Sequence, residues 1–431
     1  MNETALKPIV AEWLEETRVP ELTPRTGGRL DLNRRSDILA IVGPRRAGKT
    51  YLMYQYIGNL LAEGLRKDDI LFVDFEDYRL IGFGPADMDA LFTAFRQIAG
   101  KDPKVLFFDE VHHLPHWSRV LRTLHNRRRY RIVVSGSNSR LLGREVATEL
   151  RGRYADTLIL PFSFEEFLRY RNVSYTAATL HTHGRGKLLR AFDDYCAWGG
   201  YPEVAARETN AEKRKLLQTY LTTIFYKDII EQYNIKAKAL LESMMGYCLN
   251  TYADLFSISS FERQAKQNLG AVSKRTISNY LRYLDEAFFV ILNEKFSFSP
   301  KNRLANPRKS YLIDVGFRTL GVASGENRGK ILENIVSIEL MRRRERQFYS
   351  RDRYECDFVI LDGARPRTAV QVAWQIDASS RDRELRGLAE AMESFGIRNG
   401  MILTYNEEGT ETIHGKKVAV RPVWKWLLGA S

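Results

Sequence analysis

The stretch Gly43-Pro44-Arg45-Arg46-Ala47-Gly48-Lys49-Thr50 decides the fold of this chain. Two glycines separated by four residues and followed by Lys and Thr have the spacing of a phosphate-binding loop. The apolar run 38–42 precedes the loop, and the helix-like run 51–61 follows it. A strand, a glycine-bearing loop and a helix in this order predict an α/β fold, in which a parallel sheet carries the loop at the carboxyl end of its strand.

The residue types of this loop suit a nucleoside triphosphate with Mg²⁺. Gly43 and Gly48 permit backbone angles that aim N–H groups at phosphates, and the helix N-terminus adds the positive end of its dipole. Lys49 is expected to reach the β- and γ-phosphates, and the Thr50 hydroxyl to hold Mg²⁺. The residues expected to bind ATP are Gly43, Pro44, Arg45, Arg46, Ala47, Gly48, Lys49, Thr50 and Tyr51.

A second strand that ends in acids supports this interpretation. The apolar run 104–108 leads into Asp109 and Glu110, as expected of a central parallel strand whose carboxyl end faces the ligand. Asp109 is expected to hold Mg²⁺ through water, and Glu110 to orient and deprotonate the attacking water. An earlier strand-like run ends in Asp74 and Glu76 and is the alternative, but these acids alternate with aromatic residues, as at a strand edge.

Two further residues are candidates for contact with the reacting phosphate. Ser137 lies at the end of the strand-like run 130–138, where its hydroxyl would sense the γ-phosphate or the attacking water. Serine is also common in turns, so a plain turn is the alternative. Arg153 precedes the strand-like run 157–160. It is a candidate arginine finger, acting in cis or from a neighbouring subunit, unless it is an ordinary solvated arginine.

The composition is that of a globular protein with a basic surface. The chain has 431 residues, of which 44% are hydrophobic and 28% charged, so it is long enough for two or three domains. Its net charge of +13 favours a polyanionic partner. No apolar run approaches the ~20 residues of a membrane span, and the N-terminus lacks a signal-peptide pattern, which predicts a cytoplasmic protein without a membrane partner. Cys196, Cys248 and Cys356 lack metal-like spacing and are expected to be core residues.

The segment from about residue 240 has a winged-helix pattern. A helix is expected at 259–267, a turn at 268–272 and a second helix at 273–287, with strands of a wing at 288–292 and 309–314. One face of the second helix is apolar, and the other carries residue types that contact phosphates and base edges. The residues expected to bind double-stranded DNA are Lys274, Arg275, Asn279 and Arg282, with basic Lys295, Lys301 and Arg303 between the wing strands. The alternative is a protein-binding or intrachain module.

The last segment has the order of a PD-(D/E)XK nuclease fold. Glu333 on the helix-like run 331–340 precedes Asp357 on a strand-like run, and a third strand-like run carries Gln371. Such a fold uses acids to hold a metal and a lysine to assist the attacking water. Here the third strand has Gln371 and Ala373 in place of the acid and the lysine, and 331–415 contains no lysine. The sequence therefore predicts that the fold is kept and the cleavage chemistry is lost.

Several motifs together resemble a known family. They are Gly43 to Thr50, Phe-Phe-Asp-Glu at 107–110, Ser-Gly-Ser-Asn at 135–138, Leu-Arg-Gly-Arg at 150–153, Pro-Phe-Ser-Phe-Glu-Glu-Phe at 161–167, Gly-Gly-Tyr-Pro-Glu at 199–203 and Phe-Tyr-Lys-Asp-Ile-Ile at 225–230. The chain resembles an archaeal and bacterial family of AAA-type P-loop ATPases that carry a C-terminal domain of unknown function. In that family the C-terminal part is similar to a winged helix followed by a restriction-endonuclease-like fold. The resemblance implies ATP binding and hydrolysis, and it favours Arg153 as the finger.

These observations predict five segments. They are an N-terminal lead-in at 1–35, a P-loop ATPase core at 36–160, a helical lid or bridge at 161–238, a winged-helix domain at 239–322 and an inactive restriction-endonuclease-like domain at 323–431. Two functions remain open: an ATPase that couples nucleotide state to DNA engagement, and a signalling or chaperone-like ATPase whose winged helix binds protein. The cations on the second helix favour the first function. A homo-oligomer is compatible with both.

Overall fold

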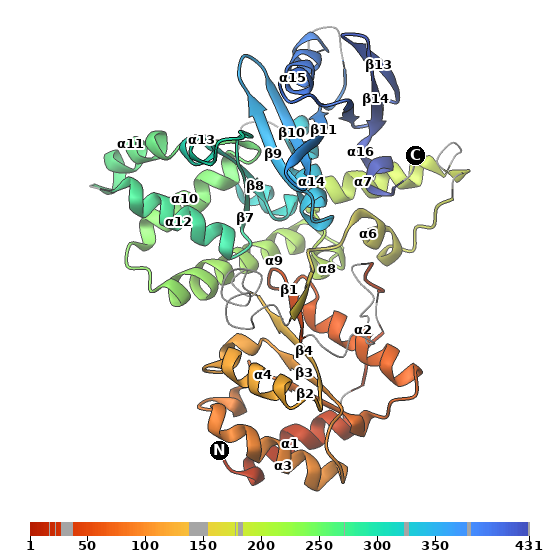
Figure 1. The fold of residues 1–431 in the computed structure, drawn as a ribbon, viewed down its shortest axis with the longest axis vertical. Helices are drawn as coiled ribbons and strands as arrows, with labels where there is room; N and C mark the ends of the chain where they lie inside the picture. Colours follow the sequence, from red (N-terminus) through yellow and green to blue (C-terminus); the bar gives the residue numbers. More distant parts are fainter. Residues whose placement is uncertain are drawn as a thin grey trace. The chain divides into compact units, whose positions relative to one another are not determined.

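The computed structural model describes residues 1–16, 18–21, 23–26, 38–137, 154–176, 178–179, 184–270, 272–322, 327–376 and 381–429. The chain divides into two compact units, Met1–Leu160 and Pro161–Ser431. Figure 1 shows both units, coloured along the sequence.

The first unit is built on a five-stranded parallel sheet. Its order is β2-β3-β4-β1-β5, so the strand before the phosphate loop lies between β4 and β5. The strands are β1 Ile38–Val42, β2 Ile70–Asp74, β3 Val105–Asp109, β4 Arg131–Gly136 and β5 Tyr154–Leu158. The helices described in this unit are α1 Glu3–Ala11, the π-helix η1 Glu12–Glu16, α2 Lys49–Ala62, α3 Met88–Ala99, α4 Trp117–Asn126, and the short 3-10 turns η2 Lys67–Asp69, η3 Tyr78–Leu80, η4 Pro85–Asp87 and η5 Val111–His113. The predicted α/β class with a P-loop core is confirmed.

The core of this unit explains why the central strands are continuous apolar runs. Residues of β1, β3 and β4 face α2 in one cluster of buried side chains, which includes Ile41, Phe107 and Val133. A parallel strand covered on both faces needs apolar side chains at every position, and all five residues of β3 are buried. Burying side chains of this size stabilises the fold by about 1.5–3 kcal/mol each before the entropy cost is subtracted.

One strand begins earlier than the sequence indicates. The strand-like run 157–160 was expected to be the strand, but β5 is Tyr154–Leu158, and Ile159 lies just beyond its end. The pairing with β1 explains the shift, because Asp156 and Thr157 lie opposite Ala40 and Ile41. Each described β5 residue is only half-buried, so backbone pairing at the sheet edge defines this strand rather than apolar burial.

The second unit begins with helices. A turn at Gly199 and Gly200 connects α7 to α8. The helices are α6 Phe164–Tyr170, α7 Arg185–Trp198, α8 Pro202–Ala205, α9 Asn210–Thr223, the π-helix η8 Ile224–Glu231, α10 Lys238–Asn250, α11 Ile258–Leu269, α12 Lys274–Glu286, α13 Pro300–Ala305, the 3-10 helix η9 Val315–Leu320, α14 Arg328–Arg342, α15 Arg381–Ser394 and α16 Val423–Leu427.

A three-stranded antiparallel sheet accompanies α10, α11 and α12. Its order is β6-β8-β7, with β6 Asp254–Phe256, β7 Val290–Asn293 and β8 Arg308–Leu312. Helix α12 starts one residue after Ser273, whose side chain accepts a hydrogen bond from the Thr276 backbone as an N-cap. The connection between β7 and β8 contains α13, so it differs from the simple basic wing that the sequence suggested. Lys295 in this connection is paired with Asp352 at 2.9 Å.

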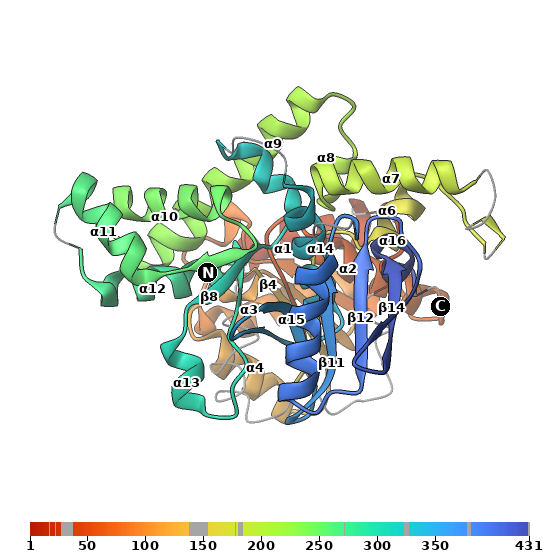
Figure 2. The ribbon, with the colours of Figure 1, turned by 90° about the horizontal axis from the view of Figure 1, so that it is seen from above.

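The last segment forms a six-stranded mixed sheet. Its order is β13-β14-β12-β11-β10-β9, and the pairs β11–β12 and β12–β14 are parallel while the others are antiparallel. The strands are β9 Arg346–Arg351, β10 Glu355–Asp362, β11 Arg365–Val372, β12 Asn399–Thr404, β13 Gly409–Ile413 and β14 Lys416–Pro422. Figure 2 shows α15 lying along strands of this sheet, and Leu388 and Met392 of that helix are buried against Val359 and Ile402.

The three cysteines are free and buried, as expected of core residues. Across the part of the chain that the structure describes, no helix is long and apolar enough to cross a membrane.

Candidate nucleotide-binding site

The phosphate loop takes its shape from two glycines. Gly43 directly follows β1, and a Cβ atom on it would lie 1.8 Å from the carbonyl oxygen of Ile159, so no side chain fits there. Gly48 has φ of 97° and is the N-cap of α2, a left-handed conformation that favours glycine. The loop therefore passes close to the chain after β5 and then turns sharply into the helix. This turn leaves the N-terminus of α2 as the natural place for an anion.

Lys49 is the first residue of α2 and is held inside the loop. It is 4% exposed, and its Nζ donates hydrogen bonds to the carbonyl oxygens of Gly43 at 3.3 Å and Pro44 at 3.2 Å. The same Nζ lies 3.2 Å from Oε1 of Glu110. The ammonium is thus placed between the phosphate loop and the acid that follows β3.

Thr50 and Asp109 are in direct contact. The Thr50 hydroxyl donates to Asp109 Oδ2 at 2.6 Å, and the other carboxylate oxygen of Asp109 accepts a hydrogen bond from the Ser135 hydroxyl of β4. Asp109 is 2% exposed, and burial, with the nearby charge of Glu110, raises its pKa. The two residues expected to hold Mg²⁺ are therefore in contact, and a cation beside them would offset the cost of the desolvated Asp109 carboxylate.

The residues fit a magnesium ion that is held mainly by the nucleotide. Among the described residues, no three His, Cys, Asp or Glu side chains are arranged to hold a metal ion. Mg²⁺ is commonly bound by one or two protein oxygens together with phosphates and waters. Thr50 and Asp109 supply this number of protein ligands.

Glu110 is held in a strained position. Its φ of 44° is left-handed, which is uncommon for a residue with a side chain and occurs often at functional sites. The Ser137 backbone N–H donates to its Oε2 at 3.0 Å, and His112 Nδ1 lies 3.3 Å from the same oxygen. Burial opposes the charge of Glu110, but Lys49 and His112 leave its pKa below the usual range. Glu110 is therefore an ionised carboxylate next to the phosphate loop.

Ser137 lies beside Glu110 through its backbone rather than through its hydroxyl. It is 5% exposed, and its N–H contact fixes the Glu110 carboxylate. A second serine, Ser135, was not singled out from the sequence, yet its hydroxyl accepts from the Glu110 N–H at 2.9 Å and donates to Asp109. The carboxyl end of β4 thus positions both acids, Asp109 at the end of β3 and Glu110 after it.

The alternative acids Asp74 and Glu76 occupy a different place. Asp74 ends β2 and pairs in register with Asp109, so it lies one strand away from the acids of β3. Glu76 is bound to Arg45 of the phosphate loop at 2.7 Å and lies 3.4 Å from His113. The His113 and Arg45 contacts hold the pKa of Glu76 well below its usual range. Glu76 therefore restrains the phosphate loop, and Glu110 is the acid that contacts Lys49.

Sequence reasoning missed Arg25. This side chain is 7% exposed, and it donates to the carbonyl oxygens of Ala47 at 2.6 Å and Leu160 at 2.5 Å. Its backbone N–H also donates to Gln55 Oε1 of α2. Arg25 therefore ties the phosphate loop to the chain after β5. It lies in a Pro- and Gly-punctuated segment with no motif, so no sequence signal could have found it.

The remaining expected contacts divide into two groups. Arg46 has φ of 64° within the loop, Ala47 is fully buried, and Tyr51 is 56% exposed on α2. These residues lie on the loop and its helix as the motif predicts. Arg153 lies outside the described residues, as do Asn138 and the rest of 138–152.

The expected DNA-contacting residues share the exposed face of α12. Lys274, Arg275 and Arg282 are exposed, whereas Asn279 is half-buried. Apolar residues of the opposite face are buried as predicted, namely Ile277, Tyr280, Leu281 and Leu284. Arg282 is paired with Glu286 at 2.8 Å, and Lys274 lies 4.0 Å from Glu262.

The three expected nuclease residues come together in the second unit. The Asp357 N–H donates to Gln371 Oε1 at 3.3 Å, and both Asp357 and Glu333 contact the ammonium of Lys309. The absence of a lysine from 331–415 suggested that no lysine is available to these acids, and this was wrong. Lys309 reaches the acids from β8, because this strand lies next to α14 and its Tyr311 ring stacks on Phe358 of β10.

Comparisons with known proteins agree with this geometry. Residues 35–168 match the family model described as an AAA domain, and residues 189–324 match that of a domain of unknown function. The chain is 33% identical to the protein MJ1544 of Methanocaldococcus jannaschii over 402 aligned residues. The alignment covers 91% of this chain and 88% of the relative. A protein of Haemophilus influenzae is 28% identical over 351 residues, spanning 80% of this chain and 85% of the relative.

Solved structures are more distant. The Walker-type ATPase PABY2304 of Pyrococcus abyssi aligns with a TM-score of 0.43 and 14% identity, covering 70% of this chain and 99% of that chain. The Aeropyrum pernix ORC1 protein in complex with DNA aligns with a TM-score of 0.29 and 14% identity, covering 79% of this chain and 93% of that chain.

The relationship to MJ1544 covers most of both chains, and the AAA-domain match contains the phosphate loop, Asp109 and Glu110. The chain therefore belongs to the same family as MJ1544, and its residues 35–168 form an AAA domain with the P-loop fold.

Proposed function

We propose that the protein binds ATP with Mg²⁺, hydrolyses it, and couples the nucleotide state to engagement of double-stranded DNA. The observation that carries the ATPase part is the chain of contacts from Lys49 to Glu110 and from Thr50 to Asp109. These contacts bring a phosphate-binding cation, a metal-binding pair and an ionised base to one edge of the sheet. Release of inorganic phosphate from ATP by the wild-type protein tests this part, and an inactive protein would contradict hydrolysis.

Each residue of the site has a separate task in this proposal. Lys49 and the backbone of residues 43–51 bind the phosphates, and Thr50 and Asp109 hold Mg²⁺, which supplies charge neutralisation at the β- and γ-phosphates. Phosphate oxygens compete for the Lys49 ammonium, so nucleotide binding releases Glu110 from its ion pair. Glu110 then accepts a proton from the attacking water, while the Ser137 N–H keeps the carboxylate in place. The Ser137 hydroxyl remains the candidate sensor of the γ-phosphate.

Arg153→Ala is expected to lower kcat by about 10- to 100-fold with little change in ATP affinity. A finger acts on charge that develops in the transition state, so its loss affects turnover rather than binding. Steady-state hydrolysis and nucleotide binding by calorimetry measure the two effects. Mixing the Arg153→Ala protein with the Lys49→Ala protein restores activity only if the finger acts across subunits of a homo-oligomer. Wild-type turnover in the Arg153 variant rules out this assignment.

The DNA part of the proposal depends on α12. We infer that the segment 239–322 is a winged-helix domain, because α10, α11 and α12 are accompanied by a small antiparallel sheet, with β6 between α10 and α11 and β7 and β8 after α12, and α12 carries an exposed basic face. The segment 161–238 is proposed as a helical bridge, and 323–431 as a restriction-endonuclease-like domain. Lys274, Arg275 and Arg282 would contact phosphates, and Asn279 is the candidate for a base edge.

The triple variant Lys274→Ala, Arg275→Ala and Arg282→Ala is expected to bind duplex DNA more weakly at every salt concentration. Each lost phosphate contact should reduce the slope of log affinity against log salt by about one unit, so the expected change is about three units. Fluorescence anisotropy with a labelled duplex, from low to physiological salt, measures the slope. A slope equal to that of the wild type would make α12 a protein-binding or intrachain helix.

A second function is supported by one observation on the same helix. The ion pairs of Arg282 with Glu286 and of Lys274 with Glu262 show that part of the basic face is balanced by acids on the module itself. A surface with both signs of charge is also suited to a protein partner. In this alternative the protein is a nucleotide-dependent signalling or chaperone-like ATPase. Salt-independent, weak DNA binding together with intact hydrolysis would favour it.

The purified protein is expected not to cut DNA with Mg²⁺ or Mn²⁺, with or without ATP. Gln371 cannot supply a negative ligand, Ala373 carries no cation, and the ammonium of Lys309 is paired with Asp357 and Glu333, the acids that would hold the metal. The loss of metal-binding groups reduces rates by orders of magnitude. Incubation with supercoiled and linear plasmid, followed by gel electrophoresis, checks this. Cleavage that survives in Lys49→Ala but disappears in Asp357→Asn would show a working nuclease centre.

A further inference from the structure

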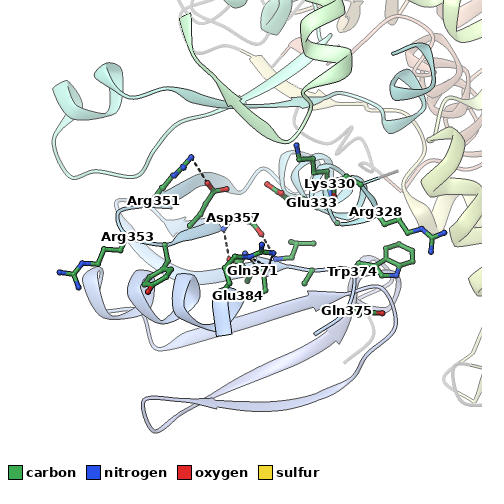
Figure 3. Close-up of a pocket in the computed structure, with 17 residues that line it drawn as sticks. Arg328, Lys330, Glu333, Arg351, Arg353, Asp357, Gln371, Trp374, Gln375 and Glu384 are labelled. Carbon is green, nitrogen blue, oxygen red and sulfur yellow. Dashed lines mark hydrogen bonds and ion pairs between the residues drawn. The ribbon is translucent and has the colours of Figure 1, made fainter. Parts of the chain in front are cut away.

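An open pocket of 1120 Å³ lies in the second unit, bordered by the start of α14 and by β10 and β11. Figure 3 shows its acidic and amide side chains in the middle, with basic side chains on both sides of them. The basic residues that line it are Arg328, Lys330, Arg351, Arg353 and Arg383. The pocket thus combines acids that suit a metal ion with cations that suit phosphate, and the contacts that its acids already make decide between these two ligands.

The ammonium of Lys309 lies among the acids of the floor. Its Nζ is 2.7 Å from Glu333 Oε1, 2.6 Å from Glu355 Oε1 and 3.0 Å from Asp357 Oδ1, and Lys309 is 2% exposed. The Tyr311 hydroxyl donates to Glu333 at 2.7 Å. Burial would lower the pKa of Lys309, but the carboxylates of Asp357 and Glu333 hold it well above its usual value. Lys309 is therefore a permanent cation at this position.

These residues do not fit the divalent cation that a restriction-endonuclease-like fold normally holds. A metal bound to Asp357 and Glu333 would lie beside the Lys309 ammonium and be repelled by it. Gln371 adds no negative ligand, because its Nε2 donates to Glu384 at 2.6 Å and its Oε1 accepts from the Asp357 N–H. In the described parts of the chain, no three side chains of Asp, Glu, His or Cys are arranged so that they could hold a metal ion.

The acids of the floor are paired with cations instead. Asp357 is balanced by Lys309, and Glu384 is balanced by Arg383 at 2.6 Å. Glu333 and Glu355 also contact the Lys309 ammonium, so three of the four acids of the floor share one cation. The exposed Arg328, Arg351 and Arg353 supply further positive charge, so an anion that enters the pocket meets cations around acids that are already paired.

The rim is basic: Arg328, Arg351 and Arg353 are exposed, whereas Lys330 is half-buried and paired with Asp254. Arg351 and Arg353 project from the β9–β10 end of the pocket, and Arg328 and Lys330 lie on the opposite side (Figure 3). Arg351 is only loosely paired, at 3.6 Å from Glu355. Arginine binds phosphate through two parallel N–H donors, and a polyanion with regularly spaced charges is the ligand that engages both sides of such a rim.

We propose that this pocket binds the phosphodiester backbone of double-stranded DNA without a metal ion, and that Lys309 permanently holds the place of the cation. This contact is separate from the one proposed for α12 and does not rest on it. The site binds and does not cleave, because no metal-bound water is formed beside Asp357.

The double variant Arg351→Ala, Arg353→Ala tests the binding. Its affinity for a labelled DNA duplex is measured by anisotropy in EDTA, without nucleotide, over a series of salt concentrations. The expected result is weaker binding and a salt slope lower by about two units, since two phosphate contacts are removed. The matched control is Arg365→Ala, Arg367→Ala, which removes the same charge from β11 at residues that do not line the pocket. The control is expected to keep the wild-type slope.

The outcomes separate this proposal from the one for α12. Loss of slope in the Arg351 and Arg353 variant, with the α12 triple variant unchanged, supports the pocket and contradicts α12. A wild-type slope in the pocket variant, or an equal loss in the control, overturns the pocket proposal. Binding of wild-type protein that requires Mg²⁺ would also overturn it, because the site would then need the metal that Lys309 replaces.

Manganese binding tests the role of Lys309 directly. Asp109→Asn protein, which lacks the proposed metal ligand of the nucleotide site, should show no increase in unfolding temperature with Mn²⁺. In the same background, Lys309→Met should lower the unfolding temperature, and Mn²⁺ should raise it again, because the freed carboxylates gain a cation. Adding Asp357→Asn should remove this rescue. If Lys309→Met does not fold, the Asp109→Asn protein alone still tests the proposal. The proposal is overturned if Mn²⁺ raises the unfolding temperature of Asp109→Asn but not that of the double variant Asp109→Asn, Asp357→Asn.

Discussion

Glu110→Gln is expected to bind ATP normally and to lose hydrolysis by about 10² to 10⁴ in kcat. The amide keeps the size of the side chain and its hydrogen bond from the Ser137 N–H, but it cannot take the proton of the attacking water. Titration calorimetry with a non-hydrolysable ATP analogue and a phosphate-release assay measure the two properties. The Ser137 contact and the Lys49 ion pair are the structural reasons to choose this acid.

Two variants serve as controls for this experiment. Lys49→Ala removes the cation of the phosphate loop and is expected to weaken triphosphate binding strongly. Glu76→Gln changes the alternative acid, which is bound to Arg45, and should reduce kcat far less than Glu110→Gln. Hydrolysis at the wild-type rate in Glu110→Gln would move the base to Glu76 or to another residue.

Lys309→Met is expected to destabilise the contact between β8, α14 and β10 by about 3–5 kcal/mol. The substitution leaves the Glu333 and Asp357 carboxyls buried without a counter-ion, and an unpaired buried charge is more costly than a missing pair. Amide hydrogen exchange by mass spectrometry should show loss of protection in 328–342 and 355–362. This local measurement suits the protein because a chain with two compact units need not unfold in one step.

The exposed pair of Lys266 and Glu262 offers a matched control. Lys266→Met removes the same charge from a residue whose side chain is 52% exposed, and surface pairs contribute about 1 kcal/mol or less. Adding Glu333→Gln to Lys309→Met should restore part of the protection, because one buried acid is then neutral. Unchanged exchange in Lys309→Met would mean that water reaches the acids and replaces the lysine.

The nucleotide site was predictable because its parts are local in sequence. The eight-residue loop carries its own glycines, lysine and threonine, and the rule that parallel strands end at one edge brings Asp109 and Glu110 to it. The same local reasoning predicted α12, since its apolar face has helical spacing and Ser273 caps it. The start of β5 was missed because an edge strand has no apolar run to mark it.

Other contacts had no signal in the sequence. Arg25 reaches Leu160 across 135 positions, and Lys309 reaches Asp357 across 48. Neither Arg25 nor Lys309 lies in a recognisable motif. Arginine and lysine side chains are usually solvated, so packing alone decides that these two are buried. The conclusion that no lysine serves the acids of the second unit was drawn from a sequence window, and the fold supplied the lysine from outside it.

The sequence by itself determined the α/β class, the phosphate loop and the acids at its edge, because a short motif fixes the backbone angles and functional groups that a triphosphate needs. Only the tertiary structure decided which acid contacts Lys49, which arginine fixes the loop, and which cation pairs with the acids of the pocket in the second unit. These choices depend on side chains brought together by strand order and helix packing, and the balance between burial and ion pairing at each of them exists only in the folded chain.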